Sequence, residues 1–287
     1  MISKARIQAV CGREIEETVS FLAMGLVSTQ APQSLSYLAD ERYLEELNDN
    51  GNVVAVFTTN ELEGKIAGRI VRYCVADPTY AFWSLFNQET EAGYQKAGSK
   101  IDATAKVHPS AFVSAYNVGI GRDTVIEPNV TVHPDVVIGD RCIIRSGTVC
   151  GFDGFERKRT SKGILLILHD GKVIIQDDVE IGSLNSIAKG MMGRDTVVGR
   201  GTKTDSLVHI AHGVQIGDEC LITACAEISG SVTIGRRCWL GPNCSIINGI
   251  KIGDEAFIGI GAVVTKSVPP AVVVAGNPAR VLRRLDE

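Results

Sequence analysis

An aliphatic residue recurs at every sixth position between Val198 and Val264. The positions are Val198, Thr204, Ile210, Ile216, Ile222, Ile228, Ile234, Leu240, Ile246, Ile252, Ile258 and Val264, and only Thr204 is not aliphatic. A period of six fits neither the 3.6-residue period of an amphipathic helix nor the two-residue alternation of a strand. It predicts a parallel β-helix, in which three six-residue units make one triangular coil of roughly 18 residues. Stacked coils bury a column of aliphatic side chains that no single unit could bury.

The limits of this period predict the domain organisation. The period begins at Ile101 and is interrupted over residues 151–174. We therefore predict a mainly β coil domain over residues 101–268, with 151–174 as an inserted loop that projects from one edge of the coil. Residues 1–100 lack the period, and their clustered apolar residues predict a small α/β domain. Residues 269–287 are expected to form a helical tail.

Two segments outside the coil carry more detailed predictions. The stretch from Tyr37 to Leu47 has an acidic first turn and is closed by Asn48-Asp49-Asn50-Gly51, so it is expected to be a helix. The stretches Ile164 to Leu168 and Lys172 to Ile175 are expected to form a hairpin that turns at His169-Asp170-Gly171.

Composition excludes several classes of function. The chain of 287 residues has a net charge of -4, which argues against general nucleic-acid binding. No apolar run approaches the length of a membrane span. Glu14 precedes the short apolar stretch from Phe21 to Val27, where a signal peptide would have positive charge. We therefore expect a cytoplasmic protein without membrane insertion.

The eight cysteines are expected to be structural. Cys142, Cys220, Cys238 and Cys244 each lie four residues after an aliphatic repeat position, where the coil needs a small and fairly apolar side chain. No Cys-x-x-Cys pair occurs, so zinc ribbons and redox motifs are not indicated. We accordingly expect no metal cofactor.

His212 is the strongest candidate for a catalytic side chain. It lies near the turn that follows Ile210, where side chains face outward between coils. Asp205, seven residues earlier, could orient its imidazole, and Gly230 lies one full coil later, directly above it. A glycine there leaves its backbone N–H open to a ligand, and an imidazole base beside such an N–H suffices for acyl transfer. Without these neighbours, His212 would be read as a solvated histidine at a coil edge.

Several segments together resemble one enzyme family. They are Gly151-Phe152-Asp153-Gly154-Phe155, Asp178-Val179-Glu180-Ile181-Gly182, Asp195-Thr196-Val197-Val198-Gly199, Gly201-Thr202-Lys203, Asp205-Ser206-Leu207-Val208-His209-Ile210-Ala211-His212 and Ile228-Ser229-Gly230-Ser231. These motifs resemble the UDP-3-O-acylglucosamine N-acyltransferases of lipid A biosynthesis over roughly residues 30 to 265. The resemblance implies a left-handed coil and a homotrimer that transfers a fatty acyl group from a carrier thioester to a sugar amine.

The resemblance also implies roles for individual residues. His212 becomes the general base, Asp205 its polar neighbour, and the Gly230 amide the donor to the oxyanion. In the N-terminal domain, Tyr37 and Tyr43 match the aromatic positions that hold a uracil ring. Asp40 falls where the family usually has an asparagine that reads the base.

The sequence departs from this family at several positions. Ala188-Lys189-Gly190 stands where the family has Asp-Arg-Gly, and Ser206 stands where it has an asparagine. Gly249 stands where the family has a second histidine. The chain also stops at Glu287 without the family's helical extension for acyl carrier protein. Its segment Ala275-Gly276-Asn277-Pro278-Ala279-Arg280 resembles the tail of coenzyme-A-dependent acetyltransferases instead.

These departures shape the functional hypotheses. The first is an N-acyltransferase that moves an acyl group from acyl-CoA to the amine of a UDP- or dTDP-linked amino sugar for cell-surface polysaccharide or lipopolysaccharide synthesis. Lys266 and Arg280 would bind the coenzyme A phosphates. The alternative is the lipid A UDP-3-O-acylglucosamine N-acyltransferase itself, using acyl carrier protein.

Two other classes of function fit the same coil less well. A zinc carbonic anhydrase needs three converging histidines. His209 and His212 are only three apart, and although His133 and His169 are 36 apart, the insertion breaks their register. A non-catalytic scaffold would leave the grouping of Asp205, His212 and Gly230 unexplained.

Overall fold

The computed structural model describes residues 4–12, 14–15 and 19–285. The chain divides into two compact units. The first comprises Met1–Tyr94 and Phe155–Leu168, and the second comprises Gln95–Gly154 and His169–Glu287. Each unit is described by itself.

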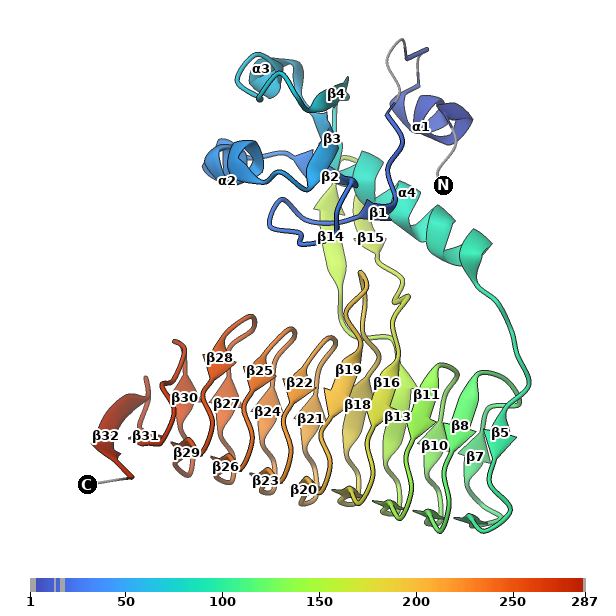
Figure 1. Ribbon diagram of the computed structural model, residues 1–287, viewed down its shortest axis with the longest axis vertical. Helices are drawn as coiled ribbons and strands as arrows, with labels where there is room; N and C mark the ends of the chain where they lie inside the picture. The colour runs from blue at the N-terminus through green and yellow to red at the C-terminus, as the bar shows by residue number, and fades with distance from the viewer. Residues whose placement is uncertain (1–3, 13, 16–18, 286–287) are drawn as a thin grey trace. The chain divides into compact units, whose positions relative to one another are not determined.

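The second unit is a parallel β-helix whose short strands fall in turn on three sheets, as is typical of a left-handed β-helix (Figure 1). Sheet I consists of β5 (Lys100–Ile101), β8 (Val118–Ile120), β11 (Val136–Ile138), β16 (Val173–Ile175), β19 (Thr196–Val198), β22 (Gln215–Ile216), β25 (Thr233–Ile234) and β28 (Lys251–Ile252). Sheet II consists of β6 (Lys106–Val107), β9 (Val125–Ile126), β12 (Ile143–Ile144), β17 (Glu180–Ile181), β20 (Lys203–Thr204), β23 (Leu221–Ile222), β26 (Trp239–Leu240), β29 (Phe257–Ile258), β31 (Val272–Ala275) and β32 (Arg280–Arg284). Sheet III consists of β7 (Phe112–Val113), β10 (Thr131–Val132), β13 (Val149–Phe152), β18 (Ser186–Ala188), β21 (His209–Ile210), β24 (Glu227–Ile228), β27 (Ser245–Ile246) and β30 (Val263–Val264).

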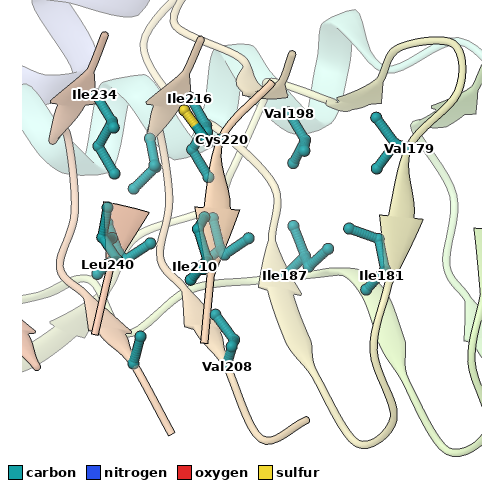
Figure 2. Close-up of a cluster of buried hydrophobic side chains, with 14 of the residues drawn as sticks. Val179, Ile181, Ile187, Val198, Val208, Ile210, Ile216, Cys220, Ile234 and Leu240 are labelled. Carbon is teal, nitrogen blue, oxygen red and sulfur yellow. The ribbon is translucent and has the colours of Figure 1, made fainter. Parts of the chain in front are cut away.

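The repeat positions form the core of the coil. Figure 2 shows Ile187 and Ile210 among the aliphatic side chains that fill the interior. Ile210 pairs in register with Ile228 of the next coil, and both are fully buried. Thr204, the one exception to the aliphatic pattern, is buried as well, and its Oγ1 accepts a hydrogen bond from the Asn185 side chain at 2.6 Å. The period therefore predicted the inward positions correctly.

The cysteines follow the same logic. Cys142, Cys220, Cys238 and Cys244 are buried members of the aliphatic core, and none of these four forms a disulfide. Burial raises the pKa of Cys244 to about 12, so its thiol stays protonated at neutral pH. This agrees with the expectation that they pack as small apolar side chains.

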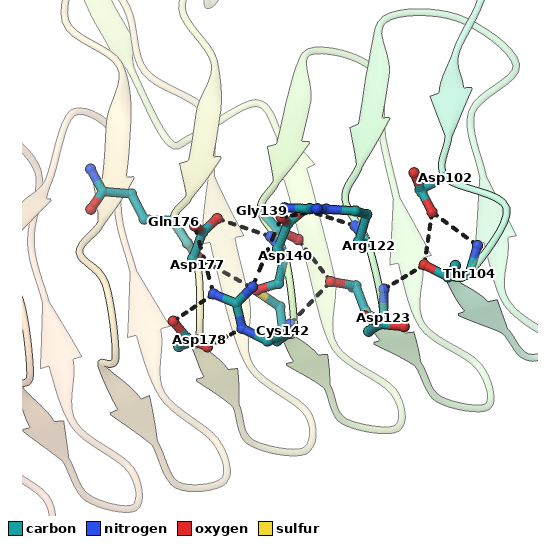
Figure 3. Close-up of polar contacts among 12 residues, drawn as sticks. Asp102, Thr104, Arg122, Asp123, Gly139, Asp140, Cys142, Gln176, Asp177 and Asp178 are labelled. Atoms are coloured by element: carbon teal, nitrogen blue, oxygen red, sulfur yellow. Dashed lines mark hydrogen bonds and ion pairs between the residues drawn. The ribbon is translucent and has the colours of Figure 1, made fainter.

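Aspartates close the corner between sheets I and II, from coil to coil (Figure 3). The Asp140 carboxylate accepts the backbone N–H of Arg122 at 2.8 Å, and Asp177 accepts that of Asp140 at 3.0 Å. The Arg122 guanidinium also donates to Asp140 and lowers the pKa of that carboxyl. Glycine precedes this corner because the coils approach closely there: a Cβ on Gly217 would lie 2.7 Å from the backbone nitrogen of Arg236.

The coil is interrupted a second time, between β18 and β19. The aliphatic positions Ile187 and Val198 are eleven residues apart, one fewer than two six-residue units, and the structure has a short loop there, closed by a bridge between Met191 and Arg194. The spacing alone could not distinguish one missing residue from five added ones, because both shift a six-residue period equally.

The first unit is a small α/β body around a parallel sheet. The sheet has the strand order β1 (Ala23–Met24), β2 (Ser34–Leu38), β3 (Val53–Thr58) and β4 (Val71–Cys74). Its helical segments are α1 (Lys4–Cys11), the 3-10 helix η1 (Glu41–Tyr43), α2 (Leu44–Asp49), α3 (Asn60–Glu63) and α4 (Pro78–Gly93). Among the described residues, no helix has the length and apolar character needed to cross a bilayer.

The predicted helix from Tyr37 to Leu47 is wrong at its start. Tyr37 lies in β2, which is held between β1 and β3, and helical structure begins only after Asp40. The Asp40 carboxylate caps η1 by accepting the Arg42 N–H at 2.9 Å. The acidic residues therefore mark the N-terminus of a helix that starts four residues later than expected.

The inserted segment also differs from its prediction. Its hairpin is formed by β14 (Arg157–Thr160) and β15 (Gly163–Leu166), which pair antiparallel and belong to the first unit. The Asn87 side chain of α4 forms hydrogen bonds with β15 and with the residues that follow it. Its amide group donates to the Leu166 carbonyl at 2.7 Å, and its carbonyl oxygen accepts the Leu168 N–H at 2.9 Å. Val173–Ile175 is a coil strand of sheet I, so His169-Asp170-Gly171 is not a hairpin turn.

The tail is not helical either. After β31 adds to sheet II, the chain turns back, and β32 pairs antiparallel with β31. An open end of a parallel sheet offers unpaired backbone groups, and β32 satisfies those of β31.

Candidate active site

His212 follows β21, at the corner between sheets III and I. Gly230 occupies the same corner one coil later and is buried. A Cβ on Gly230 would lie 2.6 Å from both Cε1 and Nε2 of the His212 ring. The half-buried imidazole therefore lies directly against the Gly230 backbone, and the sequence spacing correctly predicted this contact.

The backbone around Gly230 leaves one N–H without a partner. The Ser229 N–H donates to the Ile246 carbonyl at 3.1 Å, and the Ser231 N–H donates to the His212 carbonyl at 2.9 Å. In the described part of the chain, the N–H of Gly230 donates to no acceptor. At the corner between sheets I and II, by contrast, aspartates accept the equivalent amides, as Asp218 accepts that of Arg200 at 2.9 Å. An N–H beside an imidazole is a suitable donor for an oxyanion.

Two residues at the ends of the insertion complete the surroundings of His212. The rings of His169 and His212 are 5.5 Å apart between centroids and meet edge to face at 74°. A Cβ on Gly154 would lie 2.9 Å from Nε2 of His169 and 3.2 Å from Cδ2 of His212. Sequence reasoning missed both residues as parts of the site. The available signal was the break in the period, because a chain that leaves a coil and returns brings its two ends together.

Arg194 is a further residue that the sequence analysis did not identify. Its guanidinium donates to the carbonyl of Gly213, next to His212, and to Thr233 Oγ1 at 2.9 Å. A fixed positive charge therefore lies one residue from the candidate base. Nearby, the Asp170 carboxylate accepts the N–H of Met192 at 2.6 Å. Burial of this carboxyl raises its pKa, although the residue as a whole is exposed to solvent.

Asp205 does not lie beside His212 in the same chain. It follows β20, at the corner between sheets II and III, whereas His212 lies at the other end of β21. The Asp205 carboxylate accepts the N–H of Ser206 at 2.7 Å. The two residues are seven positions apart on a chain that turns a corner and then runs along β21, so the spacing predicted a contact that the fold does not make within one chain.

His209 occupies a different environment from His212. It points outward from sheet III, and its Nδ1 is 2.8 Å from Ser186 Oγ. Burial lowers the pKa of His209, and the neighbouring Glu227 carboxylate opposes that effect. Its ring lies on the sheet face rather than at the corner beside Gly230.

The corner that carries His212 continues as a polar column. Lys189, one coil earlier, forms ion pairs with Asp153 at 3.2 Å and Asp135 at 3.7 Å. In the other direction, Gly230 is followed by Asn248 and then Lys266, each one coil further on. Because adjacent coils are about 4.8 Å apart, the Lys266 position lies about 14 Å along the column from His212.

The second predicted coenzyme A residue lies in the antiparallel tail. Arg280 begins β32 and is exposed, as is Lys266. The preceding Ala279 donates its N–H to the Val263 carbonyl at 2.8 Å, so the tail is fastened to β30, just before Lys266. The zinc carbonic anhydrase alternative requires three converging metal ligands. Among the described residues, no three His, Cys, Asp or Glu side chains are grouped so that they could hold a metal ion.

The predicted nucleotide-binding residues lie in the first unit. Tyr37 is half-buried and packs against Phe82, with ring centroids 4.9 Å apart. Tyr43 is 49% exposed at the end of η1, with the Arg42 guanidinium 5.9 Å from its ring centroid. The Asp40 carboxylate is engaged by Arg42, whose guanidinium lowers the pKa of that carboxyl. Of the two tyrosines, Tyr43 has the more exposed ring.

Comparison with known proteins gives a consistent result. Residues 117–151, 195–230 and 231–266 match the family model described as bacterial transferase hexapeptide (six repeats). The UDP-3-O-acylglucosamine N-acyltransferase from Methylobacterium nodulans is 41% identical over 147 residues, which is 51% of this chain and 42% of that protein. The enzyme of the same name from Pseudomonas fluorescens is 35% identical over 237 residues, which is 72% of this chain and 66% of that protein. That from Coxiella burnetii is 33% identical over 236 residues, covering 71% of this chain and 67% of that protein.

Solved structures support the fold. The UDP-N-acetylglucosamine acyltransferase from Campylobacter jejuni superposes with a TM-score of 0.55 at 21% identity, over 64% of this chain and 75% of that one. The chain spans between about two fifths and two thirds of the length of the three curated relatives named above.

A substitution at Gly230 tests the geometry of the site directly. The variant Gly230→Ala places a Cβ within 2.6 Å of the His212 ring, so we expect the ring to rotate or shift while the coil is retained. A crystal structure of the variant would show the displacement. Gly119→Ala in β8 is the matched control, because its Cβ would meet only Val137 at an ordinary 3.7 Å. An unmoved His212 ring in Gly230→Ala would contradict the described contact.

Proposed function

This chain belongs to the hexapeptide-repeat acyltransferases, a family it shares with the UDP-3-O-acylglucosamine N-acyltransferases, and from that premise we propose that it transfers an acyl group from a thioester to the amine of a UDP-linked amino sugar. The observation that carries the proposal is the contact between His212 and Gly230, with ring atoms 2.6 Å from the Cβ position of the glycine. A base and a bare N–H at one corner are what acyl transfer to an amine requires.

The proposed reaction has two steps. The sugar amine attacks the thioester carbonyl while His212 removes a proton from the nitrogen, so that a C–N bond forms and the carbonyl oxygen becomes an oxyanion. The Gly230 N–H donates a hydrogen bond to that oxygen. The C–S bond then breaks, and the thiolate leaves with the proton that His212 releases. The products are an amide and a free thiol, without any oxidant or reductant.

The relatives favour the lipid A type of acceptor and donor over the acyl-CoA hypothesis. Their names specify an acylated UDP-glucosamine, and the Coxiella burnetii enzyme matches 71% of this chain. In the first unit, Tyr43 and Tyr37 are the proposed contacts for the pyrimidine ring, with Asp40 beside them. Because Tyr37 also packs against Phe82 and Trp83, the exposed Tyr43 is the residue whose loss should affect nucleotide binding alone.

We place Asp205 at the active site of a neighbouring subunit rather than at that of its own chain. The corner between sheets II and III, where Asp205 lies, exposes Leu184, Leu207 and Ile260 at 59%, 54% and 74%. Leu184 and Leu207 also adopt φ values of 57° and 62°, a left-handed conformation that costs an L-residue roughly 1–2 kcal/mol. Exposed and strained leucines do not stabilise a monomer. We propose that this corner packs against another subunit of a homotrimer and presents Asp205 to that subunit's site.

The donor has two candidates, and one observation favours each. The resemblance of the sequence motifs to the N-acyltransferases of lipid A biosynthesis favours acyl carrier protein. The column from His212 to Lys266 favours coenzyme A, because a thioester beside His212 would extend past the exposed Asn248 toward the exposed Lys266. Arg and Lys are the usual partners of pyrophosphate and phosphate groups.

The base is tested by two histidine substitutions. His212→Ala should lower kcat by about 10²–10⁴, the usual contribution of general base catalysis. His209→Ala is the matched control, because His209 lies on β21, three residues before His212, but points outward from the face of sheet III, and it should lower kcat much less. The measurement is steady-state amide formation with thiol release. Equal losses in the two variants would mean that the base is assigned wrongly.

Light scattering tests the proposed assembly. Wild-type protein at micromolar concentration should have three times the chain mass of 30.7 kDa. Leu207→Asn should weaken the trimer while easing the backbone, because asparagine tolerates positive φ better than leucine. Glu219→Asn is the control, since Glu219 has a φ of 57° at the corner between sheets I and II. A monomeric wild type, or an unaffected Leu207→Asn trimer, would contradict the proposal.

The donor is identified by comparing thioesters with one amino-sugar nucleotide. If coenzyme A is the donor, acetyl- or hydroxybutyryl-CoA should support turnover, and Lys266→Ala should raise the KM for that donor about tenfold, as for loss of one charge-assisted hydrogen bond. Tyr43→Ala is the reciprocal control and should raise only the KM for the sugar nucleotide. Turnover only with acyl carrier protein thioesters would exclude the coenzyme A donor and leave the lipid A reaction.

A further inference from the structure

We infer that His169 is a positioning residue for His212, and that its ring holds the imidazole of His212 in the orientation used for proton transfer. The inference rests on the proposed role of His212 as a base. His169 is 4% exposed, and its ring meets that of His212 edge to face with centroids 5.5 Å apart. A buried histidine in contact with a half-buried one is placed to act through its neighbour rather than on a substrate.

The position of His169 is fixed by the backbone that follows it. The Gly171 N–H donates to the Gly190 carbonyl at 3.0 Å, and a Cβ on Gly171 would lie 2.6 Å from the Gly190 carbonyl carbon. Asp170, the next residue after His169, accepts the N–H of Met192 at 2.6 Å. The segment therefore enters the coil between fixed partners, and the imidazole of His169 has little freedom to move away.

His212 is consequently enclosed by three neighbours. Gly230 lies against Cε1 and Nε2 of the ring, and Gly154 lies near Cδ2 and Cβ. Gly154 also lies near Nε2 of His169, where its missing side chain makes room for both imidazoles. With glycine backbone at two contacts and a ring at the third, we expect rotation of His212 about its side-chain bonds to require movement of His169.

Such an arrangement has a kinetic consequence. A catalytic group displaced by about 1 Å can lose about 10²-fold in rate, because proton transfer needs the reacting atoms aligned. A positioning role predicts that this loss appears in kcat, since His169 is buried and touches neither proposed substrate. A purely structural role in the coil would instead lower stability and leave the geometry of His212 unchanged.

The test uses His169→Ala and His169→Phe, which remove and retain a ring. The first readout is independent of catalysis: the rate at which diethyl pyrocarbonate modifies His212, followed by mass spectrometry of its peptide. His108 is an internal reference, because it is exposed at a distant corner. His212 should react several-fold faster in His169→Ala and near the wild-type rate in His169→Phe. If His169→Ala does not fold, His169→Leu makes the same comparison.

The second readout is a double-mutant cycle in the acyl transfer assay. His169→Ala should lower kcat by about 10–100-fold with little change in either KM, as expected for a misplaced base. Combined with His212→Ala, it should cause no further loss, because residues that act as a unit are not additive. The inference would be overturned if the kcat losses of the two single variants multiplied in the double variant. It would also be overturned if His212 reacted with diethyl pyrocarbonate at the wild-type rate in His169→Ala. Full activity of His212→Ala alone would refute the proposed function, while the reactivity measurement would still decide whether His169 positions His212.

Discussion

The stacking of inward aliphatic residues every six positions is the constraint on which the rest of the structure depends. Because Ile210 and Ile228 must both fill the interior, their strands pair in register in successive coils. Two residues further along the chain, beyond the ends of these strands, His212 and Gly230 therefore meet at one corner. The side chains of the candidate site are outside the core, but the core determines which of them are neighbours.

The sequence therefore predicted well whatever depends on this period and poorly whatever depends on other contacts. The contact between His212 and Gly230 follows from counting residues. Local acidic residues predict a helix from Tyr37 onward, but in the structure Tyr37 lies in β2 and pairs with β3. Asp205 lies within seven residues of His212, but a corner of the coil intervenes. His169 lies beyond an insertion whose path no repeat could predict.

The three corners of the coil show how one backbone serves different purposes. Between sheets I and II, aspartates such as Asp140 accept the amides of the turn, which leaves that corner closed and charged. Between sheets II and III, Leu184 and Leu207 expose large apolar side chains, which favours contact with another chain. Only between sheets III and I, within the described part of the chain, does a buried glycine amide remain beside an imidazole. The difference lies in the side chains at equivalent positions, because the strands and their pairing are the same.

The insertion explains how this third corner acquires a feature that the repeat cannot supply. A regular coil places each residue above its equivalent in the coil before, so the side chains that it brings together belong to one column. The chain leaves the coil after Gly154 and re-enters it at His169, and the re-entry brings a side chain against His212 from outside the column. The glycine at the exit leaves space for that side chain, and the anchored backbone after the re-entry holds it in place. An interruption of the repeat thus adds two contacts around His212, from Gly154 and His169, to the contact with Gly230 that the coil provides.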